Sequence, residues 1–295
     1  MEKRVVFNER WLPYLLVAPQ MIITLVFFFW PSAQAMWQSV LVEDAFGGNS
    51  KFVWFANFTS LLSDPNYYDS VRVTLVFSAL VTSIGLAISL LLAVMADRIV
   101  RGATIYKTIL IWPYAVAPAI AGVLWGFLFN PSVGIVVWLL HGIGIDFNYV
   151  MNGNQALLLV VIAAVWSQLS YNFLFFLAGL QSIPKSLIEA AAIDGAGPWR
   201  TLLTIILPNS KPVFASVAIL SFLSSWSSFL WPVMMVDQPN VSPLPLQIAV
   251  FQGQTPVNWG EVCAFGVLMV APVVVIFIAF QRWFVRGVTA SAVKG

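Results

Sequence analysis

Long apolar stretches alternate with short polar segments along the whole chain. A helix needs about 20 mainly apolar residues to cross the ~30 Å hydrocarbon core of a membrane at ~1.5 Å per residue. Stretches that meet this requirement, with no acidic or basic residue near the centre, run roughly over 12–31, 71–96, 105–129, 156–180, 213–236 and 262–283. The pattern predicts an all-α integral membrane protein with about six transmembrane helices in one domain, residues 12–283.

The first stretch also has features of a signal peptide. Basic residues precede it, and Ala33-Gln34-Ala35 resembles a cleavage site. The apolar region of a signal peptide is only about 7–15 residues long, however, and further spans follow this one. We therefore expect an uncleaved first helix.

Basic residues predict the orientation, because cytoplasmic loops carry an excess of Lys and Arg. Of the 14 Lys and Arg residues, only Lys51 and Arg72 fall outside the two termini and the connections around 97–107 and 181–211. An even number of spans places these four segments on one side of the membrane. We expect a cytoplasmic N-terminus, residues 1–11, and a cytoplasmic tail, residues 284–295.

The composition excludes several kinds of chemistry. Charged residues make up only 9% of the chain, against about 25% in a soluble domain, and a net charge of +2 gives no reason to expect a nucleic-acid partner. One cysteine, Cys263, and one histidine, His141, provide neither a metal site nor a nucleophile with its base. The sequence has no G-x-x-x-x-G-K-[ST] phosphate loop. We therefore expect no enzymatic activity, and we expect His141 to be a loop or interface residue.

One predicted cytoplasmic connection, 181–211, is longer than the others. We expect a first helix there that is capped by Ser182, has Pro184 in its first turn and ends at Gly195. Pro198 begins a second helix over 199–207. Pro208 ends that helix, and the whole segment lies outside the membrane.

Helices as short as these are marginal in water and need a partner surface. The alanines of the first helix permit close approach, and Glu189 and Asp194 offer acceptors to a basic partner. Composition alone is equally compatible with a helix that lies on the membrane surface.

The spacing within this connection resembles a family signature. Glu189-Ala190-Ala191 is followed after three residues by Gly195 and, after a further nine residues, by Ile205-x-Leu207-Pro208. This pattern is similar to the EAA signature of ATP-binding-cassette (ABC) importer permeases. The resemblance implies that the connection is the coupling helix that docks on the ATPase, and that Glu189, Ala190, Ala191, Asp194 and Gly195 contribute to the docking.

Other segments resemble the sugar-type permeases of this superfamily. Residues 10–208 are most similar to glycerol-3-phosphate permeases, whereas SSWSSFLWP and the ending QRWFVRGVTASAVKG look like the other permease of such heterodimers. The resemblance implies a type I ABC importer permease fold in a bacterial cytoplasmic (inner) membrane, and a sugar or sugar-derived solute, sn-glycerol 3-phosphate among them.

The resemblance also implies a set of partners. These are two ATPase subunits that carry ATP and Mg, a second permease (different or identical), and a periplasmic or extracellular solute-binding protein. We expect membrane lipid to surround the chain, and we expect no cofactor to bind to the chain itself.

Polar side chains on two spans are candidates for the solute path. On the fourth span Gln168 and Asn172 share a face with a spacing of four residues, and Tyr171 adjoins them. The fifth span contributes the serines Ser224 and Ser228, with the same spacing, and Trp231. Hydroxyl, amide and aromatic groups suit a sugar or polyol, but packing between helices by small polar residues is the alternative.

Two further alternatives remain at this point. Pro113 and Pro118 can bend the third span, either for gating or as a feature of packing. An ion-coupled secondary transporter would normally need a titratable group inside the membrane, and no predicted span has one near its centre.

The distribution of basic residues generates a topology prediction. A reporter fused after Gly295 should be cytoplasmic, and one inserted near Gly48 should be external, because the Lys and Arg residues are concentrated on the side of the termini. Alkaline phosphatase and green fluorescent protein fusions measure this. The opposite location for either fusion would refute the predicted orientation or the even number of spans.

Overall fold

The computed structural model describes residues 11–43, 49–98, 102–253 and 255–292. Contacts divide the chain into two compact units, which we describe separately. One comprises Met1–Asp64 and Ile248–Pro272, and the other comprises Pro65–Gln247 and Val273–Gly295. The long C-terminal helix α15, Trp259–Ala292, contributes residues to both.

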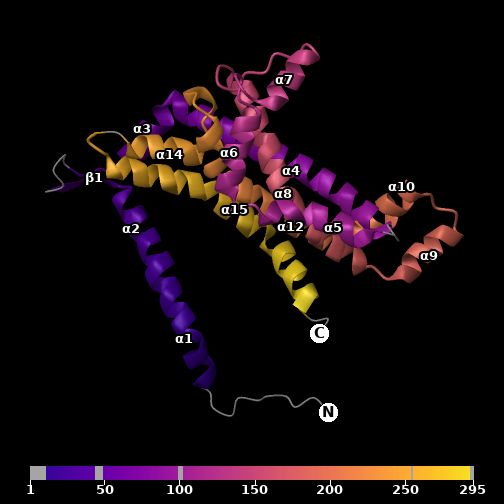
Figure 1. Ribbon diagram of the computed structural model, residues 1–295. Coiled ribbons are helices and arrows are strands. Elements are labelled where there is room, and N and C mark those ends of the chain that lie inside the picture. The colour runs from indigo at the N-terminus through magenta and orange to yellow at the C-terminus, as the bar shows by residue number, and fades with distance from the viewer. Residues whose placement is uncertain (1–10, 44–48, 99–101, 254, 293–295) are drawn as a thin grey trace. The chain divides into compact units, whose positions relative to one another are not determined.

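The larger unit is built on long apolar helices (Figure 1). Helix α4 packs against α8 and α12, and α5 packs against α8. The elements are α4 (Pro65–Arg98), α5 (Ala103–Ala115), α6 (Pro118–Leu128), α7 (Ile135–Gly142), α8 (Gly153–Gln181), α9 (Lys185–Ile193), α10 (Pro198–Thr201), the π-helical η2 (Leu202–Ile206), α11 (Leu207–Asn209), α12 (Lys211–Trp226), α13 (Leu230–Met235), the short 3-10 helix η3 (Pro239–Val241) and the first residues of α14 (Leu244–Gln252).

Two apolar clusters form the interior of this unit. The first joins the N-terminal halves of α4 and α8 to α13, and it includes Phe77, Leu159 and Trp231. The second joins the C-terminal halves of α4 and α8 to α12, and it includes Phe173, Phe176 and Val217. Small residues at the contact let the helices approach closely, so α8 is held along its whole length.

The predicted spans are confirmed in number when each bent pair of helices is counted as one span. Among the described residues, helices long and apolar enough to cross a membrane run over Leu12–Gln38, Pro65–Asp97, Gly153–Gln181 and Trp259–Gln281. Two further pairs, Thr104–Ala115 with Pro118–Leu128 and Leu202–Asn209 with Lys211–Trp226, are bent by 96° and 70°. The chain is therefore an all-α membrane protein with four to six candidate spans.

Two details of the sequence-based prediction are wrong. The third and fifth spans are not continuous helices, since α5 ends at Ala115 and α12 ends at Trp226. Helix α15 continues to Ala292, beyond the predicted sixth span, and the cytoplasmic location of the tail stays a prediction. Hydropathy measures the apolar length of a segment and does not detect where its backbone departs from the helix.

The smaller unit contains α1 (Leu12–Thr24), the π-helical η1 (Leu25–Phe29), α2 (Trp30–Gln38), β1 (Leu41–Glu43), β2 (Ser50–Phe52) and α3 (Ala56–Ser63). The two strands pair antiparallel, Leu41 with Phe52 and Glu43 with Ser50. Buried Asn57 fixes their base, because its Nδ2 donates to the carbonyl oxygens of Ser39, at 2.9 Å, and Leu41, at 2.8 Å.

The helical glycines Gly260 and Gly266 provide a matched test of this packing. A Cβ on Gly260 would overlap the carbonyl oxygen of Leu41 and would lie 2.7 Å from Asn57 Nδ2, whereas the nearest atom to a Cβ on Gly266 is 4.0 Å away. We expect Gly260→Ala to destabilise the protein by about 1–3 kcal/mol through overpacking. Gly266→Ala should be neutral or stabilising, because alanine favours helices. Thermal unfolding in detergent measures both, and equal melting temperatures would contradict this description.

Candidate functional site

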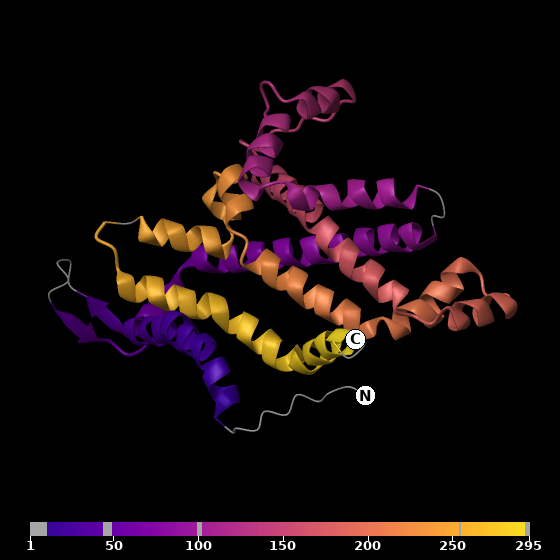
Figure 2. The ribbon, with the colours of Figure 1, turned by 60° about the horizontal axis from the view of Figure 1, so that its bottom comes forward.

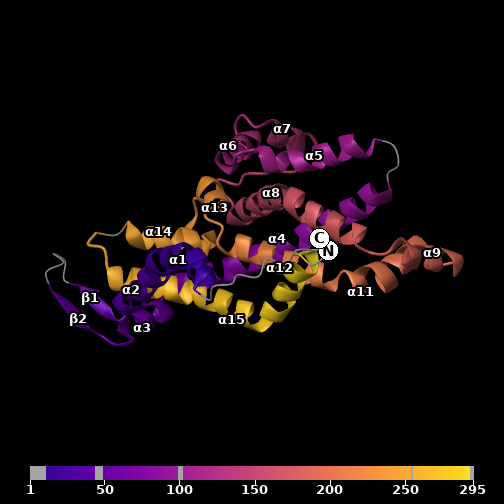
Figure 3. The same ribbon diagram turned by 90° about the horizontal axis from the view of Figure 1, so that it is seen from below.

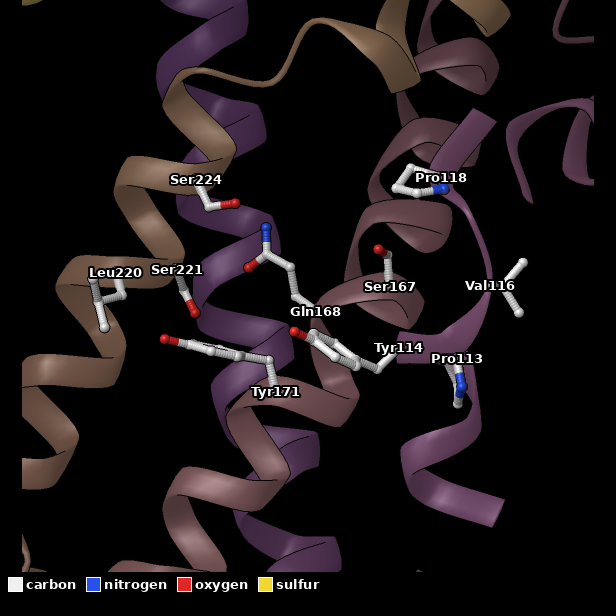
Figure 4. Close-up of a pocket in the computed structure, with 10 residues that line it drawn as sticks. All are labelled: Pro113, Tyr114, Val116, Pro118, Ser167, Gln168, Tyr171, Leu220, Ser221 and Ser224. Atoms are coloured by element: carbon white, nitrogen blue, oxygen red, sulfur yellow. The ribbon is translucent and has the colours of Figure 1, made fainter. Parts of the chain in front are cut away.

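A pocket of about 420 Å³ opens between the break of the third span and the helices α8 and α12 (Figure 4). Its walls come from three segments that are far apart in the sequence. The lining residues are Pro113, Tyr114, Val116, Pro118, Ser167, Gln168, Tyr171, Leu220, Ser221 and Ser224.

The break between α5 and α6 forms one wall of this pocket. Val116 and Ala117 have extended backbone, with ψ of 125° and 128°. A residue before proline is disfavoured in the helical region, so Pro118 explains Ala117, and Pro118 then starts α6 at a position where its missing N–H costs nothing. Pro113 remains inside α5. The two prolines therefore act differently, and Pro118 marks the bend.

Helices α8 and α12 form the opposite walls. Figure 4 shows Gln168 on α8 and Ser224 on α12 turned toward one another, and Tyr171 on α8 pointing toward Ser221 on α12. Gln168 Nε2 donates to Ser225 Oγ at 3.0 Å, and Ser221 Oγ donates to Asn172 Oδ1 at 2.9 Å. Direct hydrogen bonds between side chains thus hold the two walls together.

The structure brings together only part of the predicted solute path. Gln168, Tyr171 and Ser224 line the pocket. Asn172 is 1% exposed and lies in the seam between α8 and α12, and Trp231 is 8% exposed in the first apolar cluster. Ser228 follows the end of α12 and is not part of the lining. Tyr114 and Val116, which also line the pocket, were not predicted from the sequence. The flanking prolines indicated a bend in the third span and were the signal that could have pointed to this wall.

The pocket has hydrogen-bonding groups but no charge. The lining contains the hydroxyl groups of Tyr114, Tyr171, Ser167, Ser221 and Ser224, the Gln168 amide and apolar surface. Such a set is suited to a ligand with several hydroxyl groups. Among the described residues, no group of three or more His, Cys, Asp and Glu side chains is placed to hold a metal ion. His141 lies in the last turn of α7 rather than in a loop, and it pairs with Asp146 at 3.1 Å.

The connection after α8 forms two short helical segments outside that helix, as predicted. Figure 3 shows α9 and α11 beyond the end of α8. Gly195 has a φ of 72°, and the N–H of Ala196 bonds the carbonyl oxygen of Ala191 at 2.9 Å. This is the left-handed glycine turn expected at the end of a helix. Ser182, in contrast, does not cap α9, because its Oγ bonds the Gly179 carbonyl oxygen at the end of α8.

The second helical segment is longer than predicted. It runs from Pro198 to Asn209 through a π-helical stretch, and Pro208 lies inside it rather than at its end. The stretch Leu202–Asn209 is apolar enough to form a bent span together with α12. The prediction that this whole segment lies outside the membrane therefore remains a prediction.

The predicted coupling residues differ in exposure. Glu189, Ala190, Asp194 and Gly195 are exposed, whereas Ala191 is buried, at 5% exposed. The aliphatic side chain of Ile193 is 85% exposed. Helix α9 and the turn after it thus present the acidic groups of Glu189 and Asp194 and the apolar side chains of Leu187 and Ile193, a combination that favours contact with another protein.

The fold matches solved structures of ABC importers. A bacterial ABC transporter involved in the import of the acidic polysaccharide alginate gives a TM-score of 0.80 at 22% identity, over 94% of this chain and 96% of that one. The same kind of transporter in complex with alginate pentasaccharide-bound periplasmic protein gives 0.78 at 22% identity, over 93% and 95%. The chain therefore shares its fold with the matched chains of these two transporters.

Sequence comparisons specify the family. Residues 131–290 match the binding-protein-dependent transport system inner membrane component. The chain is 48% identical over 287 residues to the sn-glycerol-3-phosphate transport system permease protein UgpA of Rhizobium meliloti (strain 1021), covering 96% of this chain and 98% of that protein. It is 56% identical over 207 residues to UgpA of Yersinia enterocolitica, covering 70% of each. The chain belongs to the binding-protein-dependent transport system inner membrane components, as the permease subunit of an ABC importer.

These matches bear on two earlier interpretations. The similarity to the rhizobial permease covers nearly the whole chain and so continues beyond residue 208. The relatives are transport permeases, and none of the matches supports an ion-coupled secondary transporter.

The exposure pattern of α9 generates a test of the coupling loop. We expect Glu189→Lys to lower transport at least about tenfold without changing the amount of inserted protein, because a reversed charge at a docking surface costs several kcal/mol. Ala191→Leu should instead lower the amount of folded protein, since Ala191 is buried. Uptake in vesicles and quantitative immunoblotting separate the two effects. Normal uptake with Glu189→Lys would remove Glu189 from the coupling surface.

Proposed function

We propose that this permease imports a sugar-derived solute and that sn-glycerol 3-phosphate is the first candidate. The observation that carries the proposal is the 48% identity to a glycerol-3-phosphate permease over 96% of the chain. Because the match covers nearly the whole chain, it includes the helices that line the pocket.

The solute would pass along the pocket between α5, α8 and α12. Gln168, Tyr171 and Ser224 are the predicted residues that line it, and we assign them direct contact with the solute. Asn172, Ser228 and Trp231 would act behind the wall, through the packing of α8, α12 and α13. A path made of hydroxyl and amide groups replaces part of the hydration shell of a polyol without holding it tightly.

The energy for import would come from separate subunits. We assign Glu189, Ala190, Asp194 and Gly195 to the surface that docks on an ATPase, because they are exposed on or beside α9, and Ala191 to the buried side that supports it. Two ATPase subunits carrying ATP and Mg, a second permease and an external solute-binding protein complete the proposed complex. Both termini would face the cytoplasm, in agreement with the basic residues of the terminal segments.

The pocket itself favours a second candidate, an uncharged sugar or polyol. A buried phosphate normally needs Arg, Lys or free backbone N–H groups. None of the ten lining residues is charged. A phosphorylated solute would then depend on the second permease or the binding protein for its counter-charge.

Uptake competition distinguishes the two candidates. In vesicles carrying the full complex, excess unlabelled sn-glycerol 3-phosphate should block most of the ATP-dependent uptake of radiolabelled sn-glycerol 3-phosphate, whereas glycerol and a neutral disaccharide should not compete. Tyr171→Ala should raise the KM several-fold, because it removes lining surface. If sn-glycerol 3-phosphate is not taken up, and glycerol or the neutral disaccharide is taken up with ATP, the order of the two candidates is reversed.

A further inference from the structure

Matched polar side chains join α8 and α12 behind the pocket. Gln168 and Asn172 lie one turn apart on α8, and Ser221 and Ser225 lie one turn apart on α12. Gln168 Nε2 donates to Ser225 Oγ at 3.0 Å, and Ser221 Oγ donates to Asn172 Oδ1 at 2.9 Å. We name these four residues the α8–α12 latch.

Each amide in the latch uses only one of its two ends. Ser225 Oγ donates its proton to the carbonyl oxygen of Ser221 at 2.8 Å, so it accepts the bond from the Gln168 N–H. Gln168 Oε1 and Asn172 Nδ2 are then buried with no hydrogen-bond partner among the described residues. A buried polar atom without a partner costs free energy, so this arrangement is not fully satisfied.

The two unpaired atoms are complementary. Gln168 Oε1 is an acceptor and Asn172 Nδ2 is a donor, and their residues lie four positions apart on one helix. Gln and Asn side chains at this spacing can bond each other along the helix surface. These two atoms are not the ones bonded to the serines, so a bond between them within α8 does not compete with the bonds across the seam. Opening the seam therefore breaks two neutral hydrogen bonds and separates no charges, while Ser225 keeps the bond to its own helix.

The position of the latch connects it to the two functional regions. Gln168 and Ser221 line the pocket. Helix α8 ends at Gln181, directly before the loop with α9, and α12 begins at Lys211, directly after the second segment of that loop. Figure 2 shows this continuity from the orange segments into the α8 and α12 helices. Movement of the loop is therefore transmitted to both sides of the latch.

We propose that Gln168, Asn172, Ser221 and Ser225 are positioning residues that close the seam between α8 and α12 in one state of the transport cycle and release it in another. The latch sets the width of the pocket wall and couples it to the loop. This inference rests on the proposed function of α9 as the ATPase-docking helix.

Disulfide trapping tests the movement directly. In the full complex in lipid vesicles, with Cys263→Ser as background, the pair Gln168→Cys and Ser225→Cys should oxidise at rates that differ by about fivefold or more between the nucleotide-free and the vanadate-trapped state. A comparison pair, Leu110→Cys with Ser170→Cys, joins α5 and α8, where Ser170 Oγ contacts the Leu110 carbonyl oxygen at 2.8 Å. Equal rates for the latch pair in both states, or the same change in the comparison pair, would overturn the proposal.

Substitutions on α12 test the role of the hydroxyl groups. Ser221→Ala with Ser225→Ala removes both bonds across the seam but leaves Gln168 and Asn172 free to pair. We expect the ratio of binding-protein-stimulated to basal ATP hydrolysis to fall by about five- to tenfold, as the loss of two interhelical bonds shifts the balance of states. Ser221→Thr with Ser225→Thr retains the hydroxyl groups and should restore the ratio.

The control is Ser227→Ala, since the exposed Ser227 Oγ bonds only its own helix, at the Leu223 carbonyl oxygen. It should leave the ratio unchanged. A purely structural role would lower the amount of complex without changing the ratio, and an unchanged ratio in the alanine pair would overturn the latch. Failure of the parent complex to couple ATP hydrolysis to the binding protein would instead refute the proposed function.

Discussion

Every backbone N–H and C=O group inside a lipid bilayer needs a partner from the protein, and this constraint governs most of the chain. Helices α4 and α8 meet it by running without a break over their full length. Non-helical backbone at membrane depth is tolerated only where protein covers it or where it lines a cavity. The extended residues Val116 and Ala117 separate two apolar helices, and Val116 lines the pocket. The break between α5 and α6 therefore lies where the backbone lines a cavity, as this constraint requires.

Polar side chains within the spans have two roles: some join neighbouring helices, and others line the pocket. The direction in which a residue faces decides its role. Ser70, Thr74, Ser78 and Ser89 on α4 are at most 1% exposed. Ser89 Oγ donates to the Leu169 carbonyl oxygen of α8, and Thr74 Oγ1 accepts from the Leu244 N–H, so such residues join α4 to its neighbours. Ser221 and Ser225 face α8, whereas Ser224, between them in the sequence, is exposed to the pocket. A helix turns by 100° per residue, so adjacent serines have different environments. The prediction of Ser228 assumed that the helix continues past Ser224, but α12 ends at Trp226, so Ser221 and not Ser228 lines the pocket beside Ser224.

The parts of the structure that could be predicted are those that depend on length and local backbone preference. Apolar length predicted the spans, and Gly195 predicted the end of α9, because its φ of 72° suits glycine. The buried side of α9 at Ala191 could not be predicted, since a run of alanines has no periodicity to distinguish its faces. The continuation of the helical segment through Pro208 could not be predicted either. A proline near the start of a helix and a proline after its end look alike in the sequence.

The uncharged wall of the pocket is consistent with the task of a permease. A transport path has to bind its solute strongly enough to replace water, yet weakly enough to release it on the other side. A fixed cation in the wall would attract a phosphorylated solute and would also retain it, whereas hydroxyl groups bind either solute class weakly. In Gln168 the amide nitrogen is already engaged by Ser225, so the wall has less hydrogen-bonding capacity while the seam between α8 and α12 is closed. Movement of α12 would therefore change the affinity of the wall together with its width, and one physical change would serve both release and coupling.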